Sequence, residues 1–340
     1  GLPNVQKSRT FADQIRPVGA SQDKKNTTLN MVNRILIRTK IIQIAYVFYQ
    51  NENKSIESSV KELMFSLNKA YDLYNELLAL PIEITRYAQE RIEAGLAKYC
   101  PTEEELAPNR KFIENKFVKQ LAGCDELRRN LAKTGENAGG EGKKNYIKSL
   151  SEQIFQGEIY QNYMASPEQS YEEDRNLWKK LYKTYICNNE DLEQAFEEES
   201  LYWNYDKDII DTFVLKTFRK FSPEAGEKQT LLPKYTTPND EEFALTLFRK
   251  TLENEKELQD IIKQALRNWE VERIALIDQI ILQTAVAEIL NFPEIPLNVS
   301  LNEYIEIAKQ YSTPNSPGFI NGTLAGIVNQ LKKEGKLLGK

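Results

Sequence analysis

Apolar residues recur every three or four positions along most of this 340-residue chain, and this helical period limits the fold more than any other feature. The segment 33–50 shows it clearly, because its isoleucine and tyrosine side chains return at helical spacing. No segment has the apolar-polar alternation of a half-buried strand, and no glycine-rich loop has nucleotide-binding spacing. The pattern therefore predicts an all-α fold.

The same period predicts where the helices lie. In the first two thirds of the chain we expect them at 33–50, 55–99 with an interruption at Pro81, 110–133, 146–164, 169–186, 189–199 and 206–221. In the last hundred residues we expect them at 239–253, 255–268, 271–291, 300–311 and 317–335. Ser300 and Glu303 have the spacing of a capping box, which predicts a helix start at residue 300.

The chain contains no histidine, and this absence excludes many enzyme mechanisms at once. Ser-His-Asp and Cys-His arrangements and most zinc and haem sites need that side chain. The three cysteines form no CxxC pair. We therefore predict that the protein is not an enzyme and binds no metal or cofactor.

Positive charge is concentrated at the front of the chain. The net charge is -5, but residues 1–40 contain eight Lys and Arg against two Asp, so the rest of the chain is strongly acidic. An acidic protein can still bind RNA through a local group of cations, or with a basic partner that shares the phosphate contacts. No apolar run is long enough to span a membrane and no secretory signal is visible in the first 30 residues, so we expect a cytoplasmic location.

Two segments resemble the NusB family of transcription antitermination factors. The first is RTKIIQIAYVFYQ at 38–50, and the second, from about 240 to 330, contains WEVERIALIDQIILQTAVAEIL and VSLNEYIEIAKQYSTPNSPGFINGTLAGI. Four positions depart from the family pattern: Ala287 replaces a tyrosine, Tyr304 replaces a small residue, and Pro317-Gly318 replaces a polar pair. The resemblance implies a NusB-type double helical bundle enlarged by an inserted helical region. Its parts would be a flexible basic tail at 1–30, a first helix at 31–54, the insertion at 55–200 and the remaining bundle at 201–340.

The resemblance also implies a function and a set of contacts. The protein would recognise boxA-like single-stranded RNA in nascent ribosomal transcripts together with NusE, a small ribosomal protein, and would act indirectly on the RNA polymerase antitermination complex. On residue pattern alone, the arginines near the front could form an ordinary solvated helix face and Phe319 a core position. The local positive charge and the resemblance favour RNA contacts at Arg34, Arg38, Lys40, Asn315, Ser316, Gly318, Phe319 and Asn321. Contacts with NusE are expected at Tyr46, Ala287 and an exposed Glu288, and Gly322 and Gly326 are assigned to close helix packing.

Two other interpretations stay open. The chain could be a helical scaffold that binds another protein and no longer reads RNA, a reading that the departures at Ala287 and Pro317-Gly318 permit. It could also be the RNA-binding part of an rRNA methyltransferase, but that enzyme needs a nucleotide-binding sheet domain, of which the sequence has no sign. The aromatic segment 201–221 could stack RNA bases, although buried helix faces explain it better.

Overall fold

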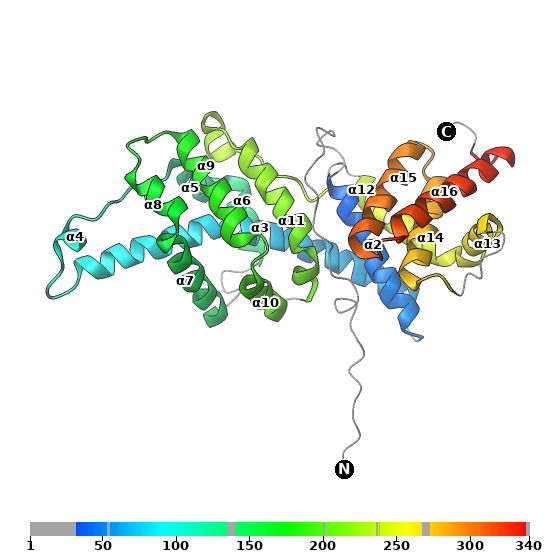
Figure 1. Cartoon of the computed structure of the whole chain (residues 1–340), viewed down its shortest axis with the longest axis horizontal. Helices are drawn as coiled ribbons and strands as arrows, with labels where there is room; N and C mark the ends of the chain where they lie inside the picture. Colours follow the sequence, from blue (N-terminus) through cyan, green and yellow to red (C-terminus); the bar gives the residue numbers. More distant parts are fainter. Residues whose placement is uncertain are drawn as a thin grey trace, which may run out of the picture. The chain divides into compact units, whose positions relative to one another are not determined.

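The computed structural model describes residues 32–52, 55–134, 140–199, 201–235, 237, 239–266 and 273–337. Within these ranges every regular element is a helix, as the periodicity predicts (Figure 1). The chain divides into unit 1, which joins Gly1–Leu67 to Tyr235–Lys340, and unit 2, which is Asn68–Lys234. Unit 2 differs from the expected insertion 55–200 at both limits. Helix α3 (Ile56–Leu96) starts in unit 1 and ends in unit 2, and unit 2 extends past residue 200 to Lys234. None of the described helices is long and apolar enough to cross a membrane.

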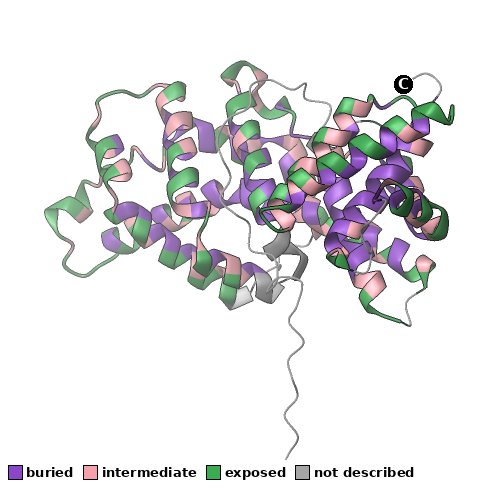
Figure 2. Cartoon of the chain, turned by 45° about the vertical axis from the view of Figure 1, so that its right-hand side comes forward, coloured by how far each residue is buried: buried purple, intermediate pink, exposed green. Residues whose placement is uncertain are grey.

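Unit 1 is built around one buried helix. Helix α14 (Leu276–Asn291) packs against α2 (Val32–Gln50), α12 (Asn239–Glu253), α13 (Glu255–Leu266), α15 (Leu297–Tyr311) and α16 (Ser316–Lys333). Its side chains are buried on every side, and buried residues also run along most of α2 (Figure 2). A helix that is apolar all round has no solvent face, so it takes the centre of a bundle. The predicted ranges of these six helices agree with the structure to within a few residues, apart from the first part of 271–291.

One predicted helix start is wrong. Helix α15 begins at Leu297 with Pro296 as its N-cap residue, three positions before the predicted start. Ser300 therefore lies inside the helix and is buried, so it does not form the predicted capping box with Glu303. Proline favours this earlier start because it fixes its own φ near the helical value and cannot continue a preceding helix.

Unit 2 contains the rest of α3 and a set of shorter helices. Pro81 lies inside α3 without ending it. The predicted helix at 146–164 is two helices, which meet at Gly157, where the backbone is extended. The Tyr185 hydroxyl lies so close to Gly157 that a Cβ atom there would clash with it. The remaining elements are α4 (Glu103–Leu106), α5 (Lys116–Gly123), α6 (Asp125–Thr134), α7 (Gly140–Gln156), α8 (Glu158–Ala165), α9 (Tyr171–Leu181), the π-helix η1 (Tyr182–Ile186), α10 (Glu190–Glu199), α11 (Leu201–Lys220) and the 3-10 helix η2 (Pro223–Lys228).

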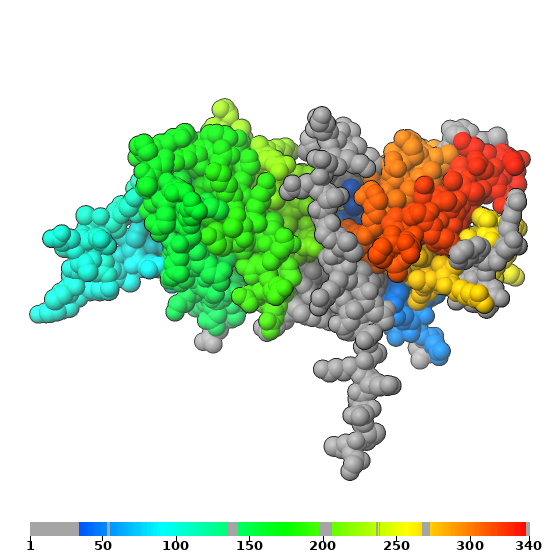
Figure 3. Space-filling model, viewed as in Figure 1, coloured from blue at the N-terminus to red at the C-terminus, as the bar shows by residue number. Residues whose placement is uncertain are grey.

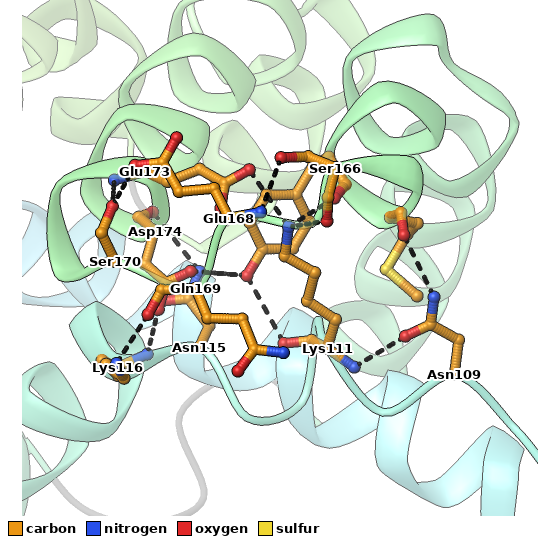
Figure 4. Close-up of polar contacts among 12 residues, drawn as sticks. Asn109, Lys111, Asn115, Lys116, Ser166, Glu168, Gln169, Ser170, Glu173 and Asp174 are labelled. Atoms are coloured by element: carbon orange, nitrogen blue, oxygen red, sulfur yellow. Dashed lines mark hydrogen bonds and ion pairs between the residues drawn. The ribbon is translucent and has the colours of Figure 1, made fainter.

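A cluster of hydrogen bonds around Lys111 and Asp174 links loops and helix ends of unit 2 (Figure 4). The Lys111 ammonium donates to the carbonyls of Tyr163 and Ser166, at 2.7 and 2.9 Å, and to the Glu173 carboxylate at 3.1 Å. The Asp174 carboxylate accepts from the Tyr163 hydroxyl and from the Lys116 backbone N–H, each at 2.7 Å. Because Lys111 and Asp174 are occupied by neighbours within the unit, we assign this cluster to stability and not to binding.

A second ionic group of unit 2 is more deeply buried. The Lys207 ammonium donates to the Asp211 carboxylate at 2.8 Å and to the Ile186 carbonyl at 2.6 Å. The Tyr182 hydroxyl donates to the same carboxylate at 2.6 Å. The described aromatic side chains nearby, Phe213 and Phe218, are also buried, which confirms the buried-face interpretation for this part of 201–221.

Candidate nucleic-acid interface

Helix α2 places its central arginine in the core of unit 1. The Arg38 guanidinium donates to both oxygens of Glu288 on α14, at 2.7 and 3.3 Å, and both side chains are fully buried. The Tyr304 hydroxyl from α15 donates to the same carboxylate at 3.2 Å. Burial by itself would lower the pKa of Arg38, but Glu288, Tyr304 and Glu303 raise it overall, so the guanidinium stays charged.

This geometry corrects two expectations. Arg38 does not lie on a solvated helix face, and Glu288 is not exposed toward a basic partner, because each is the other's buried counter-ion. A charge enters a low-dielectric core only when it is paired and hydrogen-bonded, so the two residues are buried together. Lys40 is buried as well, so its side chain is not at the surface, where we expected it to contact RNA.

The other residues expected to face a partner are also inside the bundle. Tyr46 and Ala287 are buried in the described structure, so neither side chain lies on the surface, although we expected both to contact NusE. They lie on α2 and α14, which pack directly against each other. Whether NusE binds near these helices stays a prediction.

Arg34 is the one arginine of α2 with a partly exposed side chain among those described. Its Nε donates to the Asp240 carboxylate at 2.9 Å, and 22% of the side chain remains exposed. The guanidinium lies over the Phe243 ring, 4.6 Å from the centroid. One side of Arg34 is therefore held by α12, while the exposed part can reach a ligand.

The turn between α15 and α16 is fixed by a buried carboxylate. Asp278, at the start of α14, accepts from the hydroxyls of Ser312 and Ser316 at 2.6 and 2.8 Å. Thr313 also bonds to the Ser316 hydroxyl at 2.7 Å. Ser316 is buried and its hydroxyl is occupied, so it positions the turn and is not available for the RNA contact that we expected from it.

The residues that follow this fixed turn are open to solvent. Asn315, Gly318 and Asn321 are exposed, and Phe319 is half-buried one turn into α16. Helices α15 and α16 form much of the visible face of unit 1 (Figure 3). Pro317 has no N–H group, and the N–H groups of Ser316 and Phe319 donate to the carbonyls of Thr313 and Asn315 at 3.0 and 3.3 Å. The helix dipole adds partial positive charge at this end. An aromatic ring and two exposed amide side chains therefore lie near the start of α16.

The glycines of α16 do not serve close packing. Gly322 and Gly326 are exposed, and a Cβ atom added at either would meet no atom within 4 Å. The assignment of these two residues to helix packing is therefore wrong. A spacing of four places both glycines on one face of α16, but it does not show whether another helix packs on that face.

Comparison with known proteins agrees with this architecture. A model of the NusB family matches residues 213–329. A protein of Salinibacter ruber is 46% identical over 100 residues, which cover 29% of this chain and 62% of the relative. One of Natranaerobius thermophilus is 38% identical over 95 residues, covering 28% and 68%, and one of Geobacter sulfurreducens is 43% identical over 93 residues, covering 27% and 67%.

The all-helical fold and these matches define the class, and the chain belongs to the NusB family. The matched segment spans less than two thirds of the Salinibacter ruber relative. All three relatives are described as transcription antitermination protein NusB, a regulatory role, which agrees with the prediction that the chain is not an enzyme.

Proposed function

We propose that this chain is a transcription antitermination factor that binds boxA-like single-stranded RNA together with NusE. The observation that carries the proposal is the fixed turn before α16, which leaves Asn315 exposed and Phe319 half-buried one helical turn later. Single-stranded RNA is recognised through unpaired bases that stack on aromatic rings while amides bind their edges. Family membership supports the same role, since the relatives are described as antitermination proteins.

The RNA backbone would need cations, and helix α2 offers few of them at its surface. Arg34 is the residue of α2 suited to a phosphate contact, because Arg38 and Lys40 are buried. A basic partner such as NusE would contribute further positive charge, so binding should strengthen when both proteins are present.

Replacing Phe319 by alanine tests whether this ring stacks on RNA. We expect Phe319→Ala to weaken binding of boxA RNA by about 1 to 3 kcal/mol, the usual contribution of one stacked base, with little loss of folding stability. Fluorescence titration measures the binding and thermal unfolding measures the stability.

The matched control for Phe319 is Phe48→Ala, which removes another half-buried ring of unit 1, from the end of α2. RNA binding of this variant should stay unchanged. Normal RNA binding by Phe319→Ala, with a stability loss of about 3 to 5 kcal/mol, would show that the ring is a core residue.

A helical scaffold that no longer reads RNA is the second candidate function. The observation in its favour is the burial of Arg38, Lys40 and Glu288, which leaves fewer polar contacts on the surface than we expected. A scaffold should bind its protein partner equally well with and without RNA. An antitermination factor should bind NusE and boxA RNA cooperatively.

A further inference from the structure

Unit 2 carries a row of cations on two neighbouring helices. Three of them are spaced four residues apart along α9 and its continuation η1, so they share one side of the helix. Three more lie in the last turns of α11. Helices α9 and α11 contact each other (Figure 1), and the Arg175 guanidinium donates to the Phe221 carbonyl just beyond the end of α11, at 2.7 Å. We call this group the cationic patch: Arg175, Lys179, Lys183, Lys216, Arg219 and Lys220.

Few carboxylates neutralise the cationic patch. Arg175 is paired with Glu172, while Lys179 donates to the neutral amide of Asn176 at 3.2 Å. In the described part of the chain no carboxylate lies within ion-pair distance of Lys183, Lys216 or Arg219, and all three are exposed.

The cations of the patch lie close enough to repel one another. Burial and the neighbouring charges of Arg175, Arg219 and Lys183 lower the pKa of Lys179, although Glu172 opposes the shift. Partial desolvation and the charge of Arg219 lower the pKa of Lys216, although its side chain is exposed. Like charges held together without counter-ions form a surface that an anionic ligand would stabilise.

The chemistry of the surroundings favours a nucleic-acid backbone over a protein. Protein interfaces depend on a few large apolar or aromatic anchors. The exposed large apolar side chains of the described residues lie elsewhere, at Phe65, Leu96, Tyr99 and Leu106. A patch of Lys and Arg without such anchors is suited to phosphates, which it would contact without reading base sequence.

We propose that the cationic patch is a second RNA-binding surface, which holds the phosphate backbone of a single strand independently of its sequence. The choice of RNA among anionic polymers rests on the function proposed above. The patch lies in unit 2, whereas the turn before α16 lies in unit 1, so each surface can be altered separately.

The test removes two charges of the patch in the full-length chain. Lys216 and Arg219 are exposed, so Lys216→Gln with Arg219→Gln should leave the fold intact. Polyuridylate is the probe, because it offers phosphates without a boxA sequence. We expect weaker binding, and a slope of log affinity against log salt concentration that is smaller by about 1.4, or about 0.7 for each lost phosphate contact.

The matched control removes the same charge from another helix. Arg128 and Arg129 are exposed on α6, which packs mainly on α5 and η2, so Arg128→Gln with Arg129→Gln should leave the salt slope unchanged. Equal slopes for the patch variant and this control would overturn the proposal. So would a patch variant that loses binding to phosphatidylserine vesicles and keeps its binding to polyuridylate.

The same titrations separate this proposal from the function proposed above. If Phe319→Ala has no effect and boxA RNA binds no better than polyuridylate, sequence reading by unit 1 fails. A reduced salt slope of the patch variant would still support the phosphate surface in unit 2.

Discussion

Replacing Glu288 by alanine is expected to destabilise unit 1 by about 3 to 5 kcal/mol, because it leaves the buried Arg38 guanidinium without its counter-ion. The change also removes the acceptor of the Tyr304 hydroxyl. Hydrogen exchange and denaturant unfolding would measure the effect, which should appear in α2, α14 and α15. If Glu288 were exposed, its replacement by alanine would lower the folding stability by less than about 0.5 kcal/mol.

A double variant separates the ion pair from the space that it fills. Arg38→Met with Glu288→Leu removes both charges and keeps most of the volume, and such replacements of buried pairs are often neutral or stabilising. We therefore expect the double variant to be more stable than Glu288→Ala. If the two variants are equally unstable, lost packing and not the unpaired charge explains the destabilisation of Glu288→Ala.

Replacing Asp211 by alanine is expected to cost a similar 3 to 5 kcal/mol or so, but in unit 2. Among the described residues, the change leaves the buried Lys207 ammonium with the Ile186 carbonyl as its acceptor, and the Tyr182 hydroxyl loses its partner. Hydrogen exchange should show lost protection in α9, η1 and α11.

Each of these two variants serves as the control for the other. The helices of unit 1 should keep their protection in Asp211→Ala, and those of unit 2 should keep theirs in Glu288→Ala, because each ion pair lies within one compact unit. Asp211→Asn should be milder than Asp211→Ala, since the amide still offers an acceptor oxygen. Uniform loss of protection across both units would contradict the assignment.

The helices could be predicted from the sequence because their signals are local. The structure reproduces the expected range of α12 to the residue, since its apolar period and acidic first turn lie within the helix itself. Family resemblance predicted the double bundle, and the matched segment 213–329 overlaps the second resembling segment, which runs from about 240 to 330. The break at Gly157 has a signal in the sequence, because a glycine interrupts an otherwise helical segment there. A prediction from apolar periodicity alone does not use this signal.

The burial of the expected site residues could not be predicted in the same way. Arg38 and Glu288 are 250 residues apart, so neither shows its partner in its own sequence neighbourhood. An arginine on an amphipathic helix looks the same whether it faces solvent or a buried carboxylate. Ser316 likewise has a place in an RNA-binding motif, but its hydroxyl is occupied by Asp278, which lies 38 positions earlier.

The cationic patch could be recognised only from the sequence and the helix packing together. The spacing of Arg175, Lys179 and Lys183 is visible in the sequence, but Lys216 and Arg219 join them only because α9 and α11 pack together. Charge counts over long segments hide such a group, because they average it with carboxylates that lie on other faces.

A single titration tests the central claim that this chain reads boxA-like RNA with NusE. Fluorescent boxA RNA, and an RNA of equal length with a scrambled sequence, would be titrated with the protein alone and with the protein plus NusE, at several salt concentrations. We predict that boxA RNA binds more tightly than the scrambled RNA, and that NusE increases this difference. Equal binding of the two RNAs at every salt concentration, with and without NusE, would contradict the claim.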